Sequence, residues 1–209
     1  DGGEANNVVA GTDAMASVNN DMSDGNIAIG LDTLIGGTGG IIDNIAIGRN
    51  ALNSTGANNQ TGSIAIGYSA LTALTSGIEN IAIGYLSGYQ TSTGNNNTFL
   101  GYGTGIYGPT TSDNNTFLGA YAGSGDNNNY THADNTAIGT YALQMVSGCS
   151  NNTTLGAEAG RYINTGDNNT FLGAGAGKGA TGARIGSDNN TGVGYNAGSG
   201  ITTASGSTF

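Results

Sequence analysis

The sequence predicts an all-β protein: a parallel β-solenoid, or β-roll, of about eleven short coils with a period near 18 residues. Three observations lead to this fold class. A short apolar triplet followed by glycine recurs eleven times, with neighbouring copies 17 to 21 residues apart. The chain has 40 Gly and one Pro, and only 9% of its residues are charged. A triplet is too short for a stable isolated sheet, whereas stacked coils bond to one another along the whole array.

Each repeat opens with Asn, continues through three residues of alternating character, and closes on Gly. Stacked amides can hydrogen-bond from coil to coil, and Gly permits the positive φ of a tight corner. We therefore expect two structural ladders. The first contains Asn26, Asn44, Asn80, Asn97, Asn115, Asn135, Asn152, Asn169 and Asn190, and the second contains Gly30, Gly48, Gly67, Gly84, Gly101, Gly119, Gly139, Gly156, Gly173 and Gly194.

Side chains alternate along a strand, so the residue before the glycine and the residue two earlier share a face. The residue before the glycine is aliphatic in nearly every copy, and we assign its face to the coil interior. The middle residue then points outward. In three later copies it is Phe, which needs cover from a second chain. This predicts self-association through Phe99, Phe117 and Phe171.

The whole chain, residues 1–209, is predicted to be one solenoid domain. Its first coil, near residues 7–15, is degenerate, and residues 199–209 are expected to form an irregular tail. This tail is uncharged and carries the apolar Ile201 and Phe209. Such weak capping of a solenoid favours association from end to end, with these two residues as candidate contacts.

The charge balance limits the partners. Fourteen acidic residues oppose four basic ones, for a net charge of −10, and no basic stripe is present to bind nucleic acid or anionic lipid. No apolar run is long enough to predict a membrane span. The chain begins Asp1-Gly-Gly-Glu without a charged and apolar leader, as expected after removal of a signal peptide or in a fragment.

The sequence offers little enzymatic chemistry, and we expect no catalytic activity and no cofactor. His132 is the single histidine and lies in a polar insert, which predicts a position on a surface loop. Cys149 is the single cysteine, and the four basic residues are scattered. Acidic residues precede the repeat Asn in several copies, where turn formation competes with Ca²⁺ binding as an explanation. They are Asp24, Asp43, Glu79, Asp113, Asp134, Asp167 and Asp188.

Three tyrosines are candidate glycan contacts. Tyr68, Tyr85 and Tyr102 directly follow the glycine in consecutive copies, so they should form an aromatic strip. Such a strip can bind sugar rings or pack within the ladder, and both readings stay open. The inserts at residues 37–42 and 126–134 are further candidate ligand contacts.

The segment Ser63-Ile-Ala-Ile-Gly67-Tyr-Ser-Ala70 resembles the head repeats of trimeric autotransporter adhesins, which build a left-handed parallel β-roll in a three-chain head. The form Asn115-Thr-Phe-Leu-Gly119-Ala-Tyr-Ala-Gly123 is similar to repeats of phage tail fibres and bacterial surface proteins. The resemblance covers nearly the whole chain. It implies a secreted or virion-borne head or stalk, trimer formation, and binding to host matrix or cell surfaces.

Together these features predict a non-catalytic structural or adhesive fibre protein that is extracellular, on a cell surface or on a virion. Its main expected partner is itself, in a homotrimer or an end-to-end polymer. The alternative is a glycan- or receptor-binding segment of a phage tail fibre.

Overall fold

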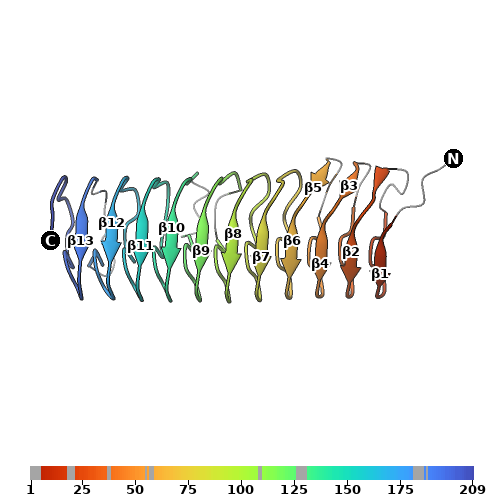
Figure 1. Ribbon diagram of the computed structural model, residues 1–209, viewed down its shortest axis with the longest axis horizontal. Coiled ribbons are helices and arrows are strands. Elements are labelled where there is room, and N and C mark those ends of the chain that lie inside the picture. Colours follow the sequence, from red (N-terminus) through yellow and green to blue (C-terminus); the bar gives the residue numbers. More distant parts are fainter. Residues whose placement is uncertain are drawn as a thin grey trace.

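The chain winds into a parallel β-solenoid. The computed structural model describes residues 6–17, 22–36, 39–54, 56, 59–107, 110–125, 131–180, 186 and 188–209. Each repeat contributes one short strand of a long sheet, and turns carry the chain back to the start of the next coil (Figure 1). The described residues contain no α-helix, and the predicted fold class is confirmed.

Eleven strands pair in parallel, one after another, along the long axis of the molecule (Figure 1). They are β1 (Val8–Ala10), β2 (Ile27–Ile29), β4 (Ile45–Ile47), β6 (Ile64–Ile66), β7 (Ile81–Ile83), β8 (Thr98–Leu100), β9 (Thr116–Leu118), β10 (Thr136–Ile138), β11 (Thr153–Leu155), β12 (Thr170–Leu172) and β13 (Thr191–Val193). A second sheet pairs β3 (Ile41–Ile42) with β5 (Gln60–Thr61).

Equivalent positions of successive repeats are direct partners across the sheet. Phe99 pairs with Phe117, for example, and the same in-register pairing joins strands at both ends of the array. A residue type that recurs at one position of the repeat therefore forms a straight row along the solenoid.

In the long sheet from β2 to β12 the middle residue of each strand is buried and points into the coil, so the predicted orientation is wrong. Phe99 is 2% exposed, and Phe117 and Phe171 are fully buried, whereas Leu118 is 40% exposed. The three phenylalanines fill the core of the coil. They offer no outward surface for self-association, and the aliphatic residue before each glycine faces solvent instead.

Side-chain alternation explains this arrangement. Asn115 opens its repeat two residues before Phe117, so both side chains lie on the same face of the strand. The side-chain amide of Asn115 is fully buried and bonds to the coils on both sides. A buried Asn therefore places Phe117 inside and Leu118 outside.

The asparagines form a continuous hydrogen-bond ladder. Asn115 Oδ1 accepts bonds from the backbone N–H and from Nδ2 of Asn135, each at 3.1 Å. Asn115 Nδ2 donates to the backbone oxygen of His132 in the following coil, also at 3.1 Å. Ser63 replaces Asn in one coil, and its N–H still donates to Asn44 Oδ1 at 2.8 Å. From Asn26 to Asn190 the ladder positions are fully buried: Asn26, Asn44, Ser63, Asn80, Asn97, Asn115, Asn135, Asn152, Asn169 and Asn190.

A glycine occupies the corner after each strand of the long sheet. At Gly119 φ is +126°, and a Cβ would lie 2.7 Å from the backbone oxygen of Gly139 in the next coil. An L side chain would fit neither the backbone angle nor the space. The corner row shares a φ between 126° and 139°: Gly30, Gly48, Gly67, Gly84, Gly101, Gly119, Gly139, Gly156, Gly173 and Gly194.

A position on the far side of the coil completes the core. It lies six residues after the middle strand residue, and it is Leu in coils such as Ala65 with Leu71 but Gly in coils such as Phe117 with Gly123. Ala65 and Leu71 are both fully buried. A Cβ on Gly123 would lie 2.1 Å from Cδ2 of Phe117, so the ring uses the space of the missing side chain.

The segment 199–209 continues the solenoid, although the sequence suggests an irregular tail. The N–H of Ser207 donates to Asn190 Oδ1 at 3.0 Å, which is the ladder contact of the earlier coils. Thr208 forms a parallel bridge to β13. Ile201 is partly buried against the core, and Phe209 is 43% exposed.

Candidate functional site

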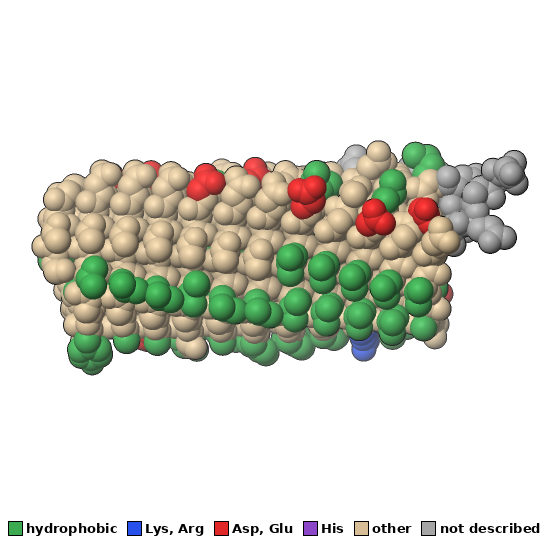
Figure 2. All heavy atoms as spheres, viewed as in Figure 1, with side chains coloured by type: hydrophobic (Ala, Val, Ile, Leu, Met, Phe, Trp, Pro, Cys, Tyr) green, Lys and Arg blue, Asp and Glu red, His purple; other side chains and the backbone are tan. Residues whose placement is uncertain are grey.

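The outward residues of the long sheet form an apolar band. One row consists of the residue before each corner glycine, and Leu100, Leu155 and Leu172 in it are 41% to 43% exposed. Figure 2 shows hydrophobic side chains in an unbroken line along the molecule, doubled over its N-terminal half. From β2 onward this row contains Ile29, Ile47, Ile66, Ile83, Leu100, Leu118, Ile138, Leu155, Leu172 and Val193.

The second row of the apolar band changes composition along the solenoid. It consists of the first residue of each strand of the long sheet, which is Ile in β2, β4, β6 and β7 and Thr in β8 to β13. The band is therefore two aliphatic side chains wide in its first part and one wide in the rest. This row contains Ile27, Ile45, Ile64, Ile81, Thr98, Thr116, Thr136, Thr153, Thr170 and Thr191.

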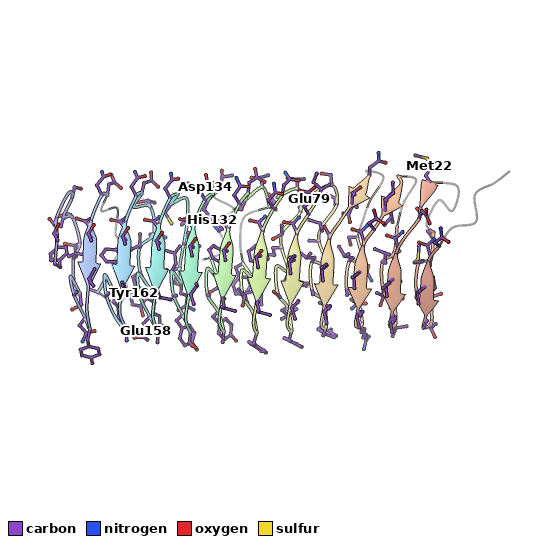
Figure 3. The ribbon with its side chains drawn as sticks, in the orientation of Figure 1. Met22, Glu79, His132, Asp134, Glu158 and Tyr162 are labelled. Carbon is purple, nitrogen blue, oxygen red and sulfur yellow. The ribbon has the colours of Figure 1, made fainter. Side chains whose placement is uncertain are left out.

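No residue of these two rows is charged, although the chain carries a net charge of −10. The Asp and Glu side chains that stand out in Figure 2 lie along the other long edge. Glu79 and Asp134 are on that edge, and Glu158 lies near the opposite one (Figure 3). Apolar and acidic surfaces are therefore segregated on the face shown.

The tyrosines stack into a column that is longer than the sequence suggests. Ring centroids of Tyr68 and Tyr85 are 5.1 Å apart, and those of Tyr85 and Tyr102 are 5.2 Å apart. Tyr121 continues the column through an edge-to-face contact with Tyr102 at 5.3 Å, and Tyr141 stacks on Tyr121 at 5.5 Å, although both follow their glycine by two residues. Both faces of Tyr85 are covered by its neighbours, so a ligand would meet ring edges and hydroxyl groups.

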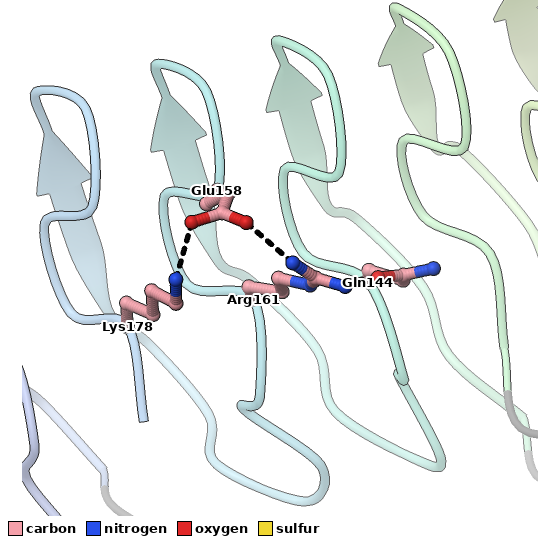
Figure 4. A network of polar contacts seen from close by, with 4 residues as sticks. All are labelled: Gln144, Glu158, Arg161 and Lys178. Carbon is pink, nitrogen blue, oxygen red and sulfur yellow. Dashed lines mark hydrogen bonds and ion pairs between the residues drawn. The ribbon is translucent and has the colours of Figure 1, made fainter. Parts of the chain in front are cut away.

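A polar network continues from the end of this column (Figure 4). Arg161 lies over the ring of Tyr141, with Cζ 4.6 Å from the centroid, and its Nε donates to Gln144 Oε1 at 2.8 Å. Glu158 forms ion pairs with both Arg161 and Lys178. The hydrogen bond from Lys178, reinforced by Arg161, lowers the pKa of Glu158. The network connects three successive coils.

The acidic residues before the repeat Asn do not converge on one point. In the part of the chain that the structure describes, no group of three or more His, Cys, Asp or Glu side chains is placed to hold a metal ion. Asp167 Oδ1 accepts the N–H of Ser150 at 2.6 Å, and Asp188 Oδ1 accepts the N–H of Asp167 at 2.8 Å. These carboxylates bond to the backbone of a neighbouring coil.

His132 and Cys149 are both core residues. His132 is 1% exposed, its ring packs against Phe117 at 5.8 Å, and neither ring nitrogen has a hydrogen-bond partner. Burial lowers the pKa of His132 to about 4 and raises the pKa of Cys149 to about 12. The expected surface position of His132 is wrong, because its side chain is packed inside the coil (Figure 3). Of the two inserts, residues 37–38 and 126–130 lie outside the described residues.

No family model, curated protein or solved structure matches this chain. None of the described residues belongs to a helix long and apolar enough to cross a bilayer. Three exposed surfaces are candidates for binding: the apolar band, the tyrosine column and the acidic edge. The apolar band is the longest of these and runs through ten consecutive strands of the sheet.

Proposed function

We propose that this chain is a non-catalytic structural or adhesive fibre segment, extracellular or virion-borne, whose copies associate side by side. The observation that carries this proposal is the uncharged apolar band along a regular solenoid. Large connected apolar surfaces on soluble proteins mark sites of association. The proposed contact surface replaces the phenylalanines, which are in the core.

The size of the apolar band fits a protein interface. Strands about 4.8 Å apart give a band roughly 50 Å long, and two outward rows make it roughly 12 Å wide. That is roughly 600 Å² on one partner, near the ~800 Å² of a standard interface. The periodicity of the rows suits a second copy best, because a copy presents side chains at the same spacing.

The regularity of the interior supports a structural role. The asparagine ladder is buried from Asn26 to Asn190, and amides such as those of Asn97 and Asn115 bond to the coils before and after them. Such a stack holds its surface rows at fixed positions without needing a large globular core. A rigid surface loses little conformational entropy when it binds, which favours assembly.

Analytical ultracentrifugation over a wide concentration range tests this proposal. We expect oligomers for the unmodified chain and dissociation in the double variant Leu118→Asp, Leu155→Asp. The matched control is Asn114→Asp, Asn168→Asp, which adds the same charge on exposed residues outside the band. A monomer at every concentration, or equal dissociation in both variants, would contradict the proposal.

The alternative, a glycan- or receptor-binding segment of a tail fibre, is favoured by the exposed tyrosine column. Tyr85 and Tyr102 are 44% and 49% exposed. A glycan array on the unmodified chain and on the triple variant Tyr68→Ala, Tyr85→Ala, Tyr102→Ala tests it. Binding that survives in the triple variant excludes these three tyrosines as the ligand site.

A further inference from the structure

The apolar band has two zones that differ in chemistry. The wide zone contains the outward Ile pairs of β2, β4, β6 and β7, and the narrow zone contains the outward Thr and aliphatic residues of β8 to β13. Register pairing makes the boundary sharp, since Ile81 of β7 pairs directly with Thr98 of β8. Figure 2 shows the same boundary, where two hydrophobic rows become one.

The two zones differ in what a dry contact would cost. An Ile pair presents only carbon atoms. The outward Thr side chains of the narrow zone are half-buried or exposed, so water reaches their hydroxyls in the free molecule. Burying a hydroxyl without a partner costs about 1–3 kcal/mol. A second molecule can therefore cover the wide zone without water more readily than the narrow zone.

We infer that a second copy docks parallel to the first, with wide zone on wide zone, and that the wide zone supplies most of the affinity. This inference rests on the side-by-side association proposed above. A parallel, in-register partner covers Ile with Ile and leaves the Thr rows facing each other, where hydroxyls can bond across the contact or through water. An antiparallel partner would place the Ile pairs of one copy on the Thr row of the other.

The charge distribution permits this arrangement. The outward strand residues of both zones are uncharged, so the −10 net charge does not place carboxylates inside the contact. The acidic edge shown in Figure 2 lies away from the band. In-register copies therefore approach through their least charged surface.

The chain supplies its own matched substitutions for a test. The narrowing variant is Ile45→Thr, Ile64→Thr, Ile81→Thr, and the widening variant is Thr116→Ile, Thr136→Ile, Thr153→Ile. Each change introduces a residue that the same row already contains in other coils, so the fold should persist. Thermal unfolding by circular dichroism checks that it does.

Narrowing should raise the dissociation constant by about tenfold or more, because three aliphatic side chains are lost from the contact. Widening should lower it by a similar factor. If the unmodified chain associates but neither variant changes the dissociation constant, the inference fails while side-by-side association stands. If the unmodified chain never associates, the proposed function fails as well.

Orientation requires a separate measurement. Cysteines introduced as Thr12→Cys and Thr202→Cys lie near opposite ends of the rod and are exposed, whereas the native Cys149 is fully buried. Energy transfer between dyes should be efficient for 12 with 12 and for 202 with 202, and inefficient for 12 with 202. Efficient transfer between 12 and 202, together with inefficient transfer for the two like pairs, would indicate an antiparallel or end-to-end partner and overturn the inference.

Discussion

Two coils of this solenoid solve the same packing problem in opposite ways. In the coil of β6, the strand contributes the small Ala65 and the far side contributes Leu71. In the coil of β9, the strand contributes Phe117 and the far side contributes Gly123. The comparison shows that the interior volume of a coil is shared between two walls. In these two coils, either wall carries the large side chain and the other wall carries a small one.

The shared interior volume can be tested most directly by placing large side chains on both walls of one coil. Gly123→Leu should destabilise the protein by more than about 4 kcal/mol or prevent folding, because its Cβ alone would lie 2.1 Å from Phe117. The backbone at this position is not the obstacle, since Leu71 has a φ of 48° in the equivalent place.

The double variant Gly123→Leu, Phe117→Ala turns the β9 coil into the β6 type and should recover most of the lost stability. Chemical denaturation of both single variants and the double variant gives the coupling free energy. Simple additivity of the two effects would show that the walls do not share volume.

The ladder of the N-terminal half differs from that of the C-terminal half in one position. The N-terminal half tolerates Ser63, whereas all later rungs up to Asn190 are Asn. Asn115→Ala should cost about 3–4 kcal/mol, because it leaves the N–H of Asn135 and the oxygen of His132 buried without this partner. Asn115→Ser should cost less, since a hydroxyl still accepts one bond. Equal losses in both variants, measured by urea unfolding, would contradict this assignment.

The C-terminal half also has a titratable residue in its core, which the equivalent positions of the N-terminal half lack. His132 occupies the position three before the ladder Asn, where the N-terminal half has Ile41 and Gln60. Burial lowers its pKa from 6.5 to about 4, so the unfolded chain binds a proton that the folded chain excludes. Stability should therefore be full above about pH 6.5 and fall by about 3 kcal/mol as the pH drops to about 4.

The variant His132→Leu is the control for this pH dependence. It should unfold at nearly constant denaturant concentration between pH 6.5 and 4, apart from the contribution of the carboxylates. An unchanged pH profile in this variant would show that another group is responsible.

The smallest effect is expected from the polar network that only the C-terminal half contains. Glu158→Gln removes the ion pairs with Arg161 and Lys178, both of them partly exposed. The loss should be less than about 1 kcal/mol and should shrink further at high salt. A loss that stays the same in 1 M salt would indicate a role other than charge pairing.

The fold could be predicted from the sequence because a strict repeat leaves few architectures. The orientation of the strand was not predicted correctly, although the sequence contained the signal. Phe at the middle position goes with Gly six residues later, and Ala goes with Leu in every coil except that of Ala82 and Gly88, where Leu71 and Phe99 of the neighbouring coils fill the space. Two positions that compensate in size in this way are expected to share an interior. The buried Asn115 leads to the same orientation, because it lies two residues before Phe117 and therefore on the same face of the strand.

Other features of the candidate site had weaker signals. Tyr121 and Tyr141 sit two residues after their glycine, one position later than Tyr68, so the column is not visible as a single repeat position. His132 lies in an insert rich in polar residues, which is typical of a surface loop. Its burial follows from its place three residues before Asn135, a position that also holds the buried Cys149 before Asn152.

The hydrogen bonds accepted by the Oδ1 atoms of the asparagine ladder run in the same direction along the chain, and this bears on the order in which the coils can fold. Each Oδ1 accepts hydrogen bonds from the coil that follows in the chain, as Asn97 does from Asn115 and Asn115 does from Asn135. A finished coil therefore presents a ready acceptor to the segment that leaves the ribosome next. Because each coil contacts only its neighbours, the solenoid can fold during synthesis one coil at a time, with each folded coil serving as the surface on which the next one forms.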